Sequence, residues 1–364
     1  MKRLTILLTS VLLAATPLLA SAAGEVNLYS ARKEQLIKPL LDRFTEETGI
    51  QVNLVTGKAD ALLKRLETEG RNTPADLLIT TDAGRLHRAK EAGVLQPVAS
   101  ETLESAIPEN LRDPEAYWFG LSQRARPIFY VKDKVDPSEL STYEDLAGEK
   151  GKGRICIRSS DNIYNQSLVA SMIANTGEQQ TESWAKGLVA NLARPPKGGD
   201  RDQVKAAAAG QCDIAIANTY YVAAMLDSKD ADEQAAADKV AIFWPNQDGR
   251  GAHVNVSGIG MTAAAKNGDN ATKLMEYLVG QEAQQWYAEV NHEYPVIADV
   301  EWSDILRGWG DFKADTLNLS KLGELNADAV RLMDRAGDGV TVSALTAATS
   351  SRTTERNRPE LVRV

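Results

Sequence analysis

The sequence is poor in the residues that carry most enzymatic and zinc chemistry. Its 364 residues include only two cysteines and three histidines, His87, His253 and His292. The cysteines have no histidine beside them to complete a four-ligand zinc site, and no two histidines have the i, i+4 spacing of a metal-binding helix. No G-x-S-x-G elbow, P-loop or G-x-G-x-x-G motif follows a strand-like run. The sequence therefore lacks the signatures of a hydrolase, a kinase or a dinucleotide-dependent enzyme, and we predict that the protein is not an enzyme.

An excess of positive charge is also missing. The chain has 41 Lys and Arg against 50 Asp and Glu, a formal net charge of −9. This balance disfavours nonspecific binding to nucleic acid or to anionic lipid. Hydrophobic residues at 43% and charged residues at 25% are typical of a protein that folds in water, and the length favours about two domains. We expect a small or cationic ligand and no nucleic-acid partner.

Long apolar runs are absent after the first two dozen residues. Lys2 and Arg3 precede an apolar run at residues 4–15, and small residues follow at 20–22. This order is typical of a cleavable secretory signal. An anchoring helix, the alternative, needs about 20 apolar residues, which is more than this run contains. We therefore predict a signal peptide at residues 1–22 and a periplasmic location.

The two cysteines, Cys156 and Cys212, lie far apart in the sequence. In an exported protein an even pair of cysteines is more often bridged than free. We predict a disulfide between them with a structural role. On the chain-entropy model a crosslink across a loop of this length contributes roughly 4 kcal/mol.

Short β-type runs alternate with segments of helical period along the chain. The β-type runs lie at residues 26–29, 51–55, 75–80, 154–157 and 213–217, and the helical segments at residues 33–48, 58–69, after Asp82, 164–175 and 219–226. Alternation of this kind predicts an α/β fold with parallel strands covered by helices. Ligands of such folds bind in the crevice beyond the carboxyl ends of the strands.

Two extended stretches, residues 123–130 and 254–261, are suited to link two α/β lobes. A double crossing gives a hinge with a defined bending axis, on which the lobes can close around a ligand. The tail from Asp311 onward has a helical apolar stripe that we expect to pack on the second lobe. The predicted N-lobe comprises residues 23–125 plus 257–300, and the predicted C-lobe residues 126–256 plus 301–364.

Three tyrosines stand at the starts of two predicted helices. Tyr220 and Tyr221 follow the strand at residues 213–217, and Tyr164 follows the strand at residues 154–157 and a polar turn. Both positions belong to the edge where a ligand crevice is expected. The simple alternative is amphipathic packing with the hydroxyl groups in water.

Phenols are hard oxygen donors that bind metals strongly only when deprotonated. At neutral pH this requires a small, highly charged cation, because the reference pKa of tyrosine is near 10. Ferric iron meets this requirement better than zinc or calcium. Three phenolates cancel its charge. Because three protein ligands leave coordination positions open, a small anion or one more protein oxygen is expected to complete the coordination sphere.

Two arginines point to such an anion. Arg124 and Arg126 lie two apart in an extended run and share one face of a strand. We expect at least one of them to bind an oxyanion beside the metal, with Ser160 as a further donor; ordinary salt bridging at the surface is the alternative.

Several stretches resemble the periplasmic ferric-iron-binding proteins of bacterial ABC importers, and the likeness runs through nearly the whole chain after the signal peptide. They are LYSARKE at 28–34, PADLLIT at 74–80, RAR at 124–126, CIRSSDNIYNQS at 156–167, CDIAIANTYY at 212–221 and HVNVSG at 253–258. The resemblance implies a two-lobed, transferrin-like clamp with iron in the cleft, and direct ligation by Tyr164, Tyr220 and Tyr221.

The first lobe departs from the commonest patterns of that family. Some relatives carry a histidine, or a histidine followed by a tyrosine, where this chain has residues 32–34, and others use a glutamate where it has Thr81. The chain thus resembles the subgroup that relies on three tyrosines and a synergistic anion such as carbonate, held by an arginine matching Arg124 or Arg126.

Two carboxylates of the first lobe remain open alternatives. Glu34 is a further candidate iron ligand, although a solvated place at a helix start is the simpler explanation because acidic residues favour first turns. Asp82 is ambiguous in the same way.

Together these features predict a monomeric, exported solute-binding protein that captures Fe(III) and delivers it to an inner-membrane ABC permease with its ATPase. A binding protein for another small cargo, such as a polyamine, thiamine or a phosphorylated compound, is the nearest alternative. A periplasmic enzyme with a tyrosine base is a third reading, disfavoured because histidine and nucleophile partners are missing.

Overall fold

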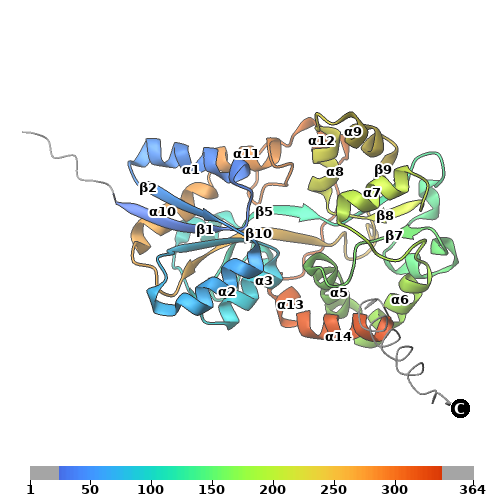
Figure 1. Ribbon diagram of the computed structural model, residues 1–364, viewed down its shortest axis with the longest axis horizontal. Coiled ribbons are helices and arrows are strands. Elements are labelled where there is room, and N and C mark those ends of the chain that lie inside the picture. The colour runs from blue at the N-terminus through green and yellow to red at the C-terminus, as the bar shows by residue number, and fades with distance from the viewer. Residues whose placement is uncertain (1–23, 338–364) are drawn as a thin grey trace, which may run out of the picture.

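The computed structural model describes residues 24–337 of the chain. Two β-sheets, each covered by helices, lie at opposite ends of an elongated molecule (Figure 1). The predicted signal peptide and residues 338–364 lie outside the described residues. In the described part of the chain, no helix is long and apolar enough to cross a membrane. The predicted α/β fold is confirmed.

The first sheet begins with three β–α units. They are β1 (Glu25–Ser30), α1 (Glu34–Thr48), β2 (Gln51–Thr56), α2 (Ala59–Glu69), β3 (Leu77–Thr81) and α3 (Ala83–Glu91). Strand β1 lies between β2 and β3, and all three are parallel. Helix α1 buries a stripe of helical period that includes Leu40 and Phe44, and it ends at Gly49, whose φ of 74° suits a residue without Cβ.

Later parts of the chain complete this sheet. Strand β10 (Val254–Thr262) pairs antiparallel with β3, and β4 (Leu95–Gln96) and β5 (Phe119–Ala125) both pair with β10. The remaining helices around this sheet are α4 (Glu101–Ala106), α10 (Gly268–Leu278) and α11 (Gln281–Glu289). Helices α1 and α11 lie on one side of the sheet and α2 and α3 on the other (Figure 1).

The second sheet has the order β7-β8-β6-β9. Its strands are β6 (Ile128–Val131), β7 (Ile155–Cys156), β8 (Ile214–Ile216) and β9 (Val240–Phe243), and its helices are α5 (Ile163–Thr176), α6 (Glu178–Ala190), α7 (Asp200–Ala208), α8 (Thr219–Leu226) and α9 (Ala231–Asp238). Strands β7 and β8 are parallel, and β6 is antiparallel to both β8 and β9. Helices α5 and α8 therefore begin beyond the same edge of the sheet.

The chain crosses between the sheets through β5–β6 and again through β9–β10. The extended stretch expected at residues 123–130 forms two strands, divided at Arg126 and Pro127, where proline supplies no N–H for a ladder. All nine residues of β10 belong to the first sheet, so the predicted lobe boundary between residues 256 and 257 falls inside this strand. The division into lobes otherwise stays a prediction.

The C-terminal part of the described chain spans both sheets. Helix α14 (Asn326–Ala336) packs on α5 and α6, whereas α13 (Ser320–Glu324) contacts both α3 and α5, and α12 (Asp304–Gly308) contacts α8 (Figure 1). At Gly323 any Cβ would overlap the side chain of His87 in α3. The tail thus holds the two α/β parts together as well as packing on the second one.

Candidate metal centre

The three tyrosines lie at the starts of two helices that follow the carboxyl ends of the parallel strands β7 and β8. Tyr164 is the second residue of α5, and its backbone N–H donates to Oδ1 of the capping residue Asn162 at 3.0 Å. Tyr220 and Tyr221 are the second and third residues of α8. Because parallel β7 and β8 end side by side, the helix starts that follow them converge, as the sequence predicted.

The phenol groups meet at the edge of the sheet. The hydroxyl oxygens of Tyr164 and Tyr220 are 3.2 Å apart, and the ring centroids of Tyr220 and Tyr221 are 4.3 Å apart. Small hard cations bind oxygen at about 2.1 Å in octahedral geometry, so neighbouring ligand oxygens lie about 3 Å apart. The Tyr220 hydroxyl donates a hydrogen bond to the Tyr164 hydroxyl oxygen, and the separation of these two oxygens is close to this value. All three side chains are half-buried, which leaves them accessible to a ligand.

The surroundings oppose deprotonation of these phenols when no cation is bound. Burial raises the pKa of Tyr220 well above 10, and the neighbouring phenols of Tyr164 and Tyr221 raise it further against the opposing effect of Arg124. Burial, followed by Tyr164, raises the pKa of Tyr221 to about 12. A cation that binds here must therefore displace protons, which only a strong Lewis acid does at neutral pH.

Arg124 reaches the site from β5. It is buried and donates from Nη1 to Ser257 Oγ at 2.7 Å and from Nη2 to the Val256 carbonyl at 2.7 Å. Its guanidinium carbon is 5.9 Å from the ring centroid of Tyr164. The nearest carboxylate oxygen, from Glu293, is 3.9 Å from Nη1. Arg124 thus brings a positive charge to the tyrosines and retains N–H groups for a further acceptor.

Arg126 is also buried beside the tyrosines, but protein groups already surround it. Its guanidinium donates to Asp200, Asn218 and Asn165. The predicted role of Arg126 as an anion ligand stays a prediction, like that of Arg124.

The remaining predicted residues occupy different places. Ser160 is buried in the turn before α5. Glu34 is exposed at the first position of α1, and within residues 24–337 its side chain forms no hydrogen bond or ion pair with the tyrosines. The role of Glu34 as a ligand stays a prediction.

Asp82 faces the second lobe from the start of α3. Its carboxylate accepts from Ser167 Oγ of α5 at 2.8 Å, from Asn255 Nδ2 at 2.9 Å and from the Gly84 N–H at 2.9 Å. Burial raises the pKa of this carboxyl group, against the opposing effect of Arg124. Both oxygens of Asp82 are thus already hydrogen-bonded within the protein. The hydrogen bond from Ser167 joins the two lobes at this point.

Sequence reasoning missed several residues that surround the tyrosines. Arg158 has its guanidinium carbon 5.4 Å from the ring centroid of Tyr164. Arg32, noted only as a departure from the family pattern, is buried just after β1, donates to Glu293 Oε2 at 2.6 Å and interacts electrostatically with Tyr220. Asp200 opens α7 in a polar, charged stretch that resembles many exposed helix starts. These partners lie far apart in the sequence, so no local pattern indicates them.

A small cavity of about 10 Å³ adjoins Tyr164 at the junction of the two sheets. Its lining consists of Asp82, Arg124, Arg126, Tyr164, Asn218, His253 and Asn255. Burial and nearby arginines lower the pKa of His253 to about 3, so its imidazole is neutral at physiological pH. Among residues 24–337 no cluster of three or more His, Cys, Asp or Glu side chains is arranged to hold a metal ion. The donor set at this site is therefore phenolic, with positive charge beside it.

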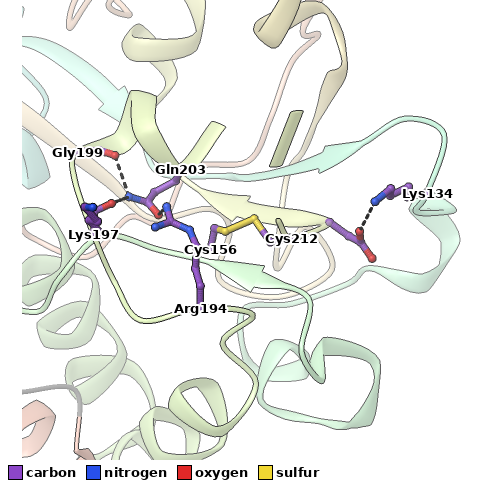
Figure 2. Close-up of a disulfide and its surroundings, with 8 residues drawn as sticks. Lys134, Cys156, Arg194, Lys197, Gly199, Gln203 and Cys212 are labelled. Carbon is purple, nitrogen blue, oxygen red and sulfur yellow. Dashed lines mark hydrogen bonds and ion pairs between the residues drawn. A yellow bond between two sulfur atoms is a disulfide. The ribbon is translucent and has the colours of Figure 1, made fainter. Parts of the chain in front are cut away.

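The predicted disulfide between Cys156 and Cys212 is present, with a Cα–Cα distance of 5.9 Å. It links the end of β7 to the residues just before β8 (Figure 2). The two strands that carry the tyrosine-bearing helices are thus joined covalently.

Two α/β sheets connected by crossing strands, with a polar cavity between them, define the two-lobed class of solute-binding proteins. The chain belongs to the bacterial extracellular solute-binding protein family, whose sequence model matches residues 29–285. This membership confirms the prediction of a binding protein and not an enzyme.

Individual relatives extend the likeness over most of the chain. Iron uptake protein A1 of Synechocystis is 51% identical over 313 residues, which cover 86% of this chain and 87% of the relative. A Trichodesmium protein called IdiA or FutA, solved with iron and citrate ligands, is 56% identical with a TM-score of 0.85, over 86% of this chain and 99% of that one. The ferric binding protein of Campylobacter jejuni is 43% identical with a TM-score of 0.81, over 86% and 99%. These likenesses confirm the predicted family and the two-lobed fold.

Proposed function

We propose that this protein captures Fe(III) between its lobes, with Tyr164, Tyr220 and Tyr221 as phenolate ligands. The observation that carries the proposal is the convergence of these tyrosines, with the hydroxyl oxygens of Tyr164 and Tyr220 at 3.2 Å. The iron-binding relatives support the same cargo, because a Trichodesmium protein of 56% identity was solved with iron.

The charges around the site favour a synergistic anion. Three phenolates neutralise a ferric ion, whereas Arg124 adds a positive charge with no carboxylate in hydrogen-bonding range. An octahedral ion with three phenolate ligands has three positions left, which a chelating oxyanion can share. We propose carbonate held by Arg124, with Ser160 as a second donor. Citrate, present in the Trichodesmium complex, is the competing anion.

The family and the sequence support a proposal for where this protein acts and what it delivers iron to. We infer that the signal peptide at residues 1–22 directs the chain to the periplasm, where it acts as a monomer. The two α/β lobes close about the crossing strands, with Asp82 and Ser167 among the groups that meet between them. The loaded protein then delivers iron to an inner-membrane ABC permease with its ATPase.

Other cargoes fit the site less well. A polyamine requires carboxylates and open aromatic faces, whereas this cavity is lined by arginines and the oxygens of Asp82 are already bonded. A phosphorylated compound would use several helix-opening N–H groups and would not require clustered phenols.

The proposal is tested with purified protein, ferric salt and bicarbonate. We expect a visible phenolate-to-iron charge-transfer band that weakens and shifts in Tyr220→Phe. Tyr130→Phe is the matched control, because Tyr130 is half-buried in β6 of the same sheet. An identical band in wild type and Tyr220→Phe would place the iron elsewhere.

A further inference from the structure

We propose that Arg126 is a positioning residue that joins the starts of α5 and α8 and so fixes the spacing between Tyr164 and the Tyr220–Tyr221 pair. The inference rests on the proposed function, because the spacing matters only if these tyrosines share an ion. It assigns Arg126 a role distinct from anion binding, which falls to Arg124.

Arg126 forms hydrogen bonds with one residue near Tyr164 and with one residue near the Tyr220–Tyr221 pair. Its Nη2 donates to Oδ1 of Asn165, the residue after Tyr164, at 2.7 Å. Its Nη1 donates to Oδ1 of Asn218, two residues before Tyr220, at 2.9 Å. Because the guanidinium is rigid and planar, the two contacts fix the distance between the helix starts in a way that a flexible ammonium does not.

A buried carboxylate anchors this arrangement. Asp200 Oδ2 accepts from Arg126 Nη1 at 2.8 Å and from the backbone N–H of Asn218 at 2.8 Å. Both members of the ion pair are buried, with side-chain exposures of 2% and 0%. Asp200 thus neutralises Arg126 and holds the backbone just before α8 directly.

Asp200 is in turn held in place by its own surroundings. It is the first residue of α7, and Gln203 of that helix donates to the carbonyls of Lys197 at 2.9 Å and Gly199 at 3.0 Å (Figure 2). Asp200 Oδ1 lies 3.3 Å from Arg158 Nη1, and Arg158 itself lies over the ring of Tyr164. The loop before α7 therefore delivers a fixed carboxylate to the two helix starts.

Arg124 and Arg126 differ in how many of their N–H groups already have protein acceptors. Arg126 engages both hydrogens of Nη1 and one of Nη2 with protein acceptors and has its charge paired with Asp200. Arg124 makes two hydrogen bonds, to a hydroxyl and a carbonyl, and pairs with no carboxylate at hydrogen-bonding distance. An incoming anion gains more from Arg124, because Arg126 would first have to release its partners.

The disulfide and Arg126 both restrain the two β–α units that carry the tyrosines, the disulfide at the strands and Arg126 at the helix starts. Cys156 and Cys212 join the strands, whereas Arg126 joins the helix starts that follow them. Covalent linkage of the strands leaves the helix starts free to separate, and Arg126 removes that freedom. The hydroxyl oxygens of Tyr164 and Tyr220 are then already close to the spacing that iron requires before it binds.

The test compares Arg126→Lys and Asn165→Ala with Arg154→Lys as control. Arg154 is an ion-paired arginine at the opposite end of the same strands, bonded to Asp213 at 3.1 Å and Glu139 at 3.0 Å. Iron affinity and the charge-transfer band are measured at several bicarbonate concentrations, with circular dichroism as a check on folding. Partners that orient metal ligands typically change affinity about 10- to 100-fold, and we expect a loss of that size with a shifted band in both test variants.

The bicarbonate series separates the two roles of Arg126. A positioning role predicts the same loss at every bicarbonate concentration and the same behaviour in Asn165→Ala. Rescue of Arg126→Lys by high bicarbonate, with Asn165→Ala like wild type, would assign Arg126 to the anion and overturn the inference. Wild-type affinity and band in both folded variants would overturn it too, as would failure of both to fold, since Arg126 would then serve the fold as a whole. A wild type without any band would refute the proposed function itself.

Discussion

Iron binding by three phenols makes the affinity of this protein steeply dependent on pH. Burial raises the pKa of Tyr220 and Tyr221 above the ordinary value, so the protonated form prevails at neutral pH in the absence of iron. Each phenol that binds as a phenolate releases one proton. Three released protons change the apparent affinity by about 1000-fold per pH unit, or about 4 kcal/mol, with weaker binding at lower pH.

This slope is measured by competition with a chelator of known pH dependence between about pH 6 and 8, at constant ionic strength. An anion that enters as bicarbonate and binds as carbonate adds one more proton to the count. We therefore expect the logarithm of the affinity to rise by 3 to 4 per pH unit, and Tyr220→Phe to lower that slope by one. A slope of one or less, after correction for iron hydrolysis, would show that the tyrosines are not the main ligands.

Two further predictions concern the framework of the site. Replacement of both Cys156 and Cys212 by serine should lower the free energy of unfolding by roughly 4 kcal/mol, as measured by urea denaturation. Without the crosslink across 56 residues, the unfolded chain gains conformational entropy. An unchanged midpoint and slope of the denaturation curve would contradict this prediction. Gly323→Ala should destabilise the protein by about 1–3 kcal/mol because its Cβ would overlap His87 between the lobes, whereas Gly308→Ala, with open space around its Cα, should change little; equal effects of the two would show that α13 adjusts freely.

The arrangement of strands and helices around the tyrosines could be predicted from the sequence. Periodicity predicted α8 at its observed bounds and α1, β2 and α5 within one or two residues, because their apolar residues face a core with regular spacing. The positions of Tyr164 and Tyr220 after parallel strands then follow from general rules of α/β folds.

The side-chain contacts that join these strands and helices could not be predicted in the same way. Arg126 meets Asp200 and Asn218, which lie 74 and 92 residues away in the sequence. Such pairs leave no periodic signal, and a buried arginine looks like a surface arginine in the sequence. The packing of α13 on both lobes was missed for the same reason, because its apolar stripe shows that a helix is covered but not what covers it.

The most direct test of the central claim is a crystal structure of the protein loaded with Fe(III) in bicarbonate. We predict one ferric ion within bonding distance of the hydroxyl oxygens of Tyr164, Tyr220 and Tyr221, with a small oxyanion between the iron and Arg124. An iron bound without these three oxygens, or a cleft that holds an organic solute on other groups, would contradict the account.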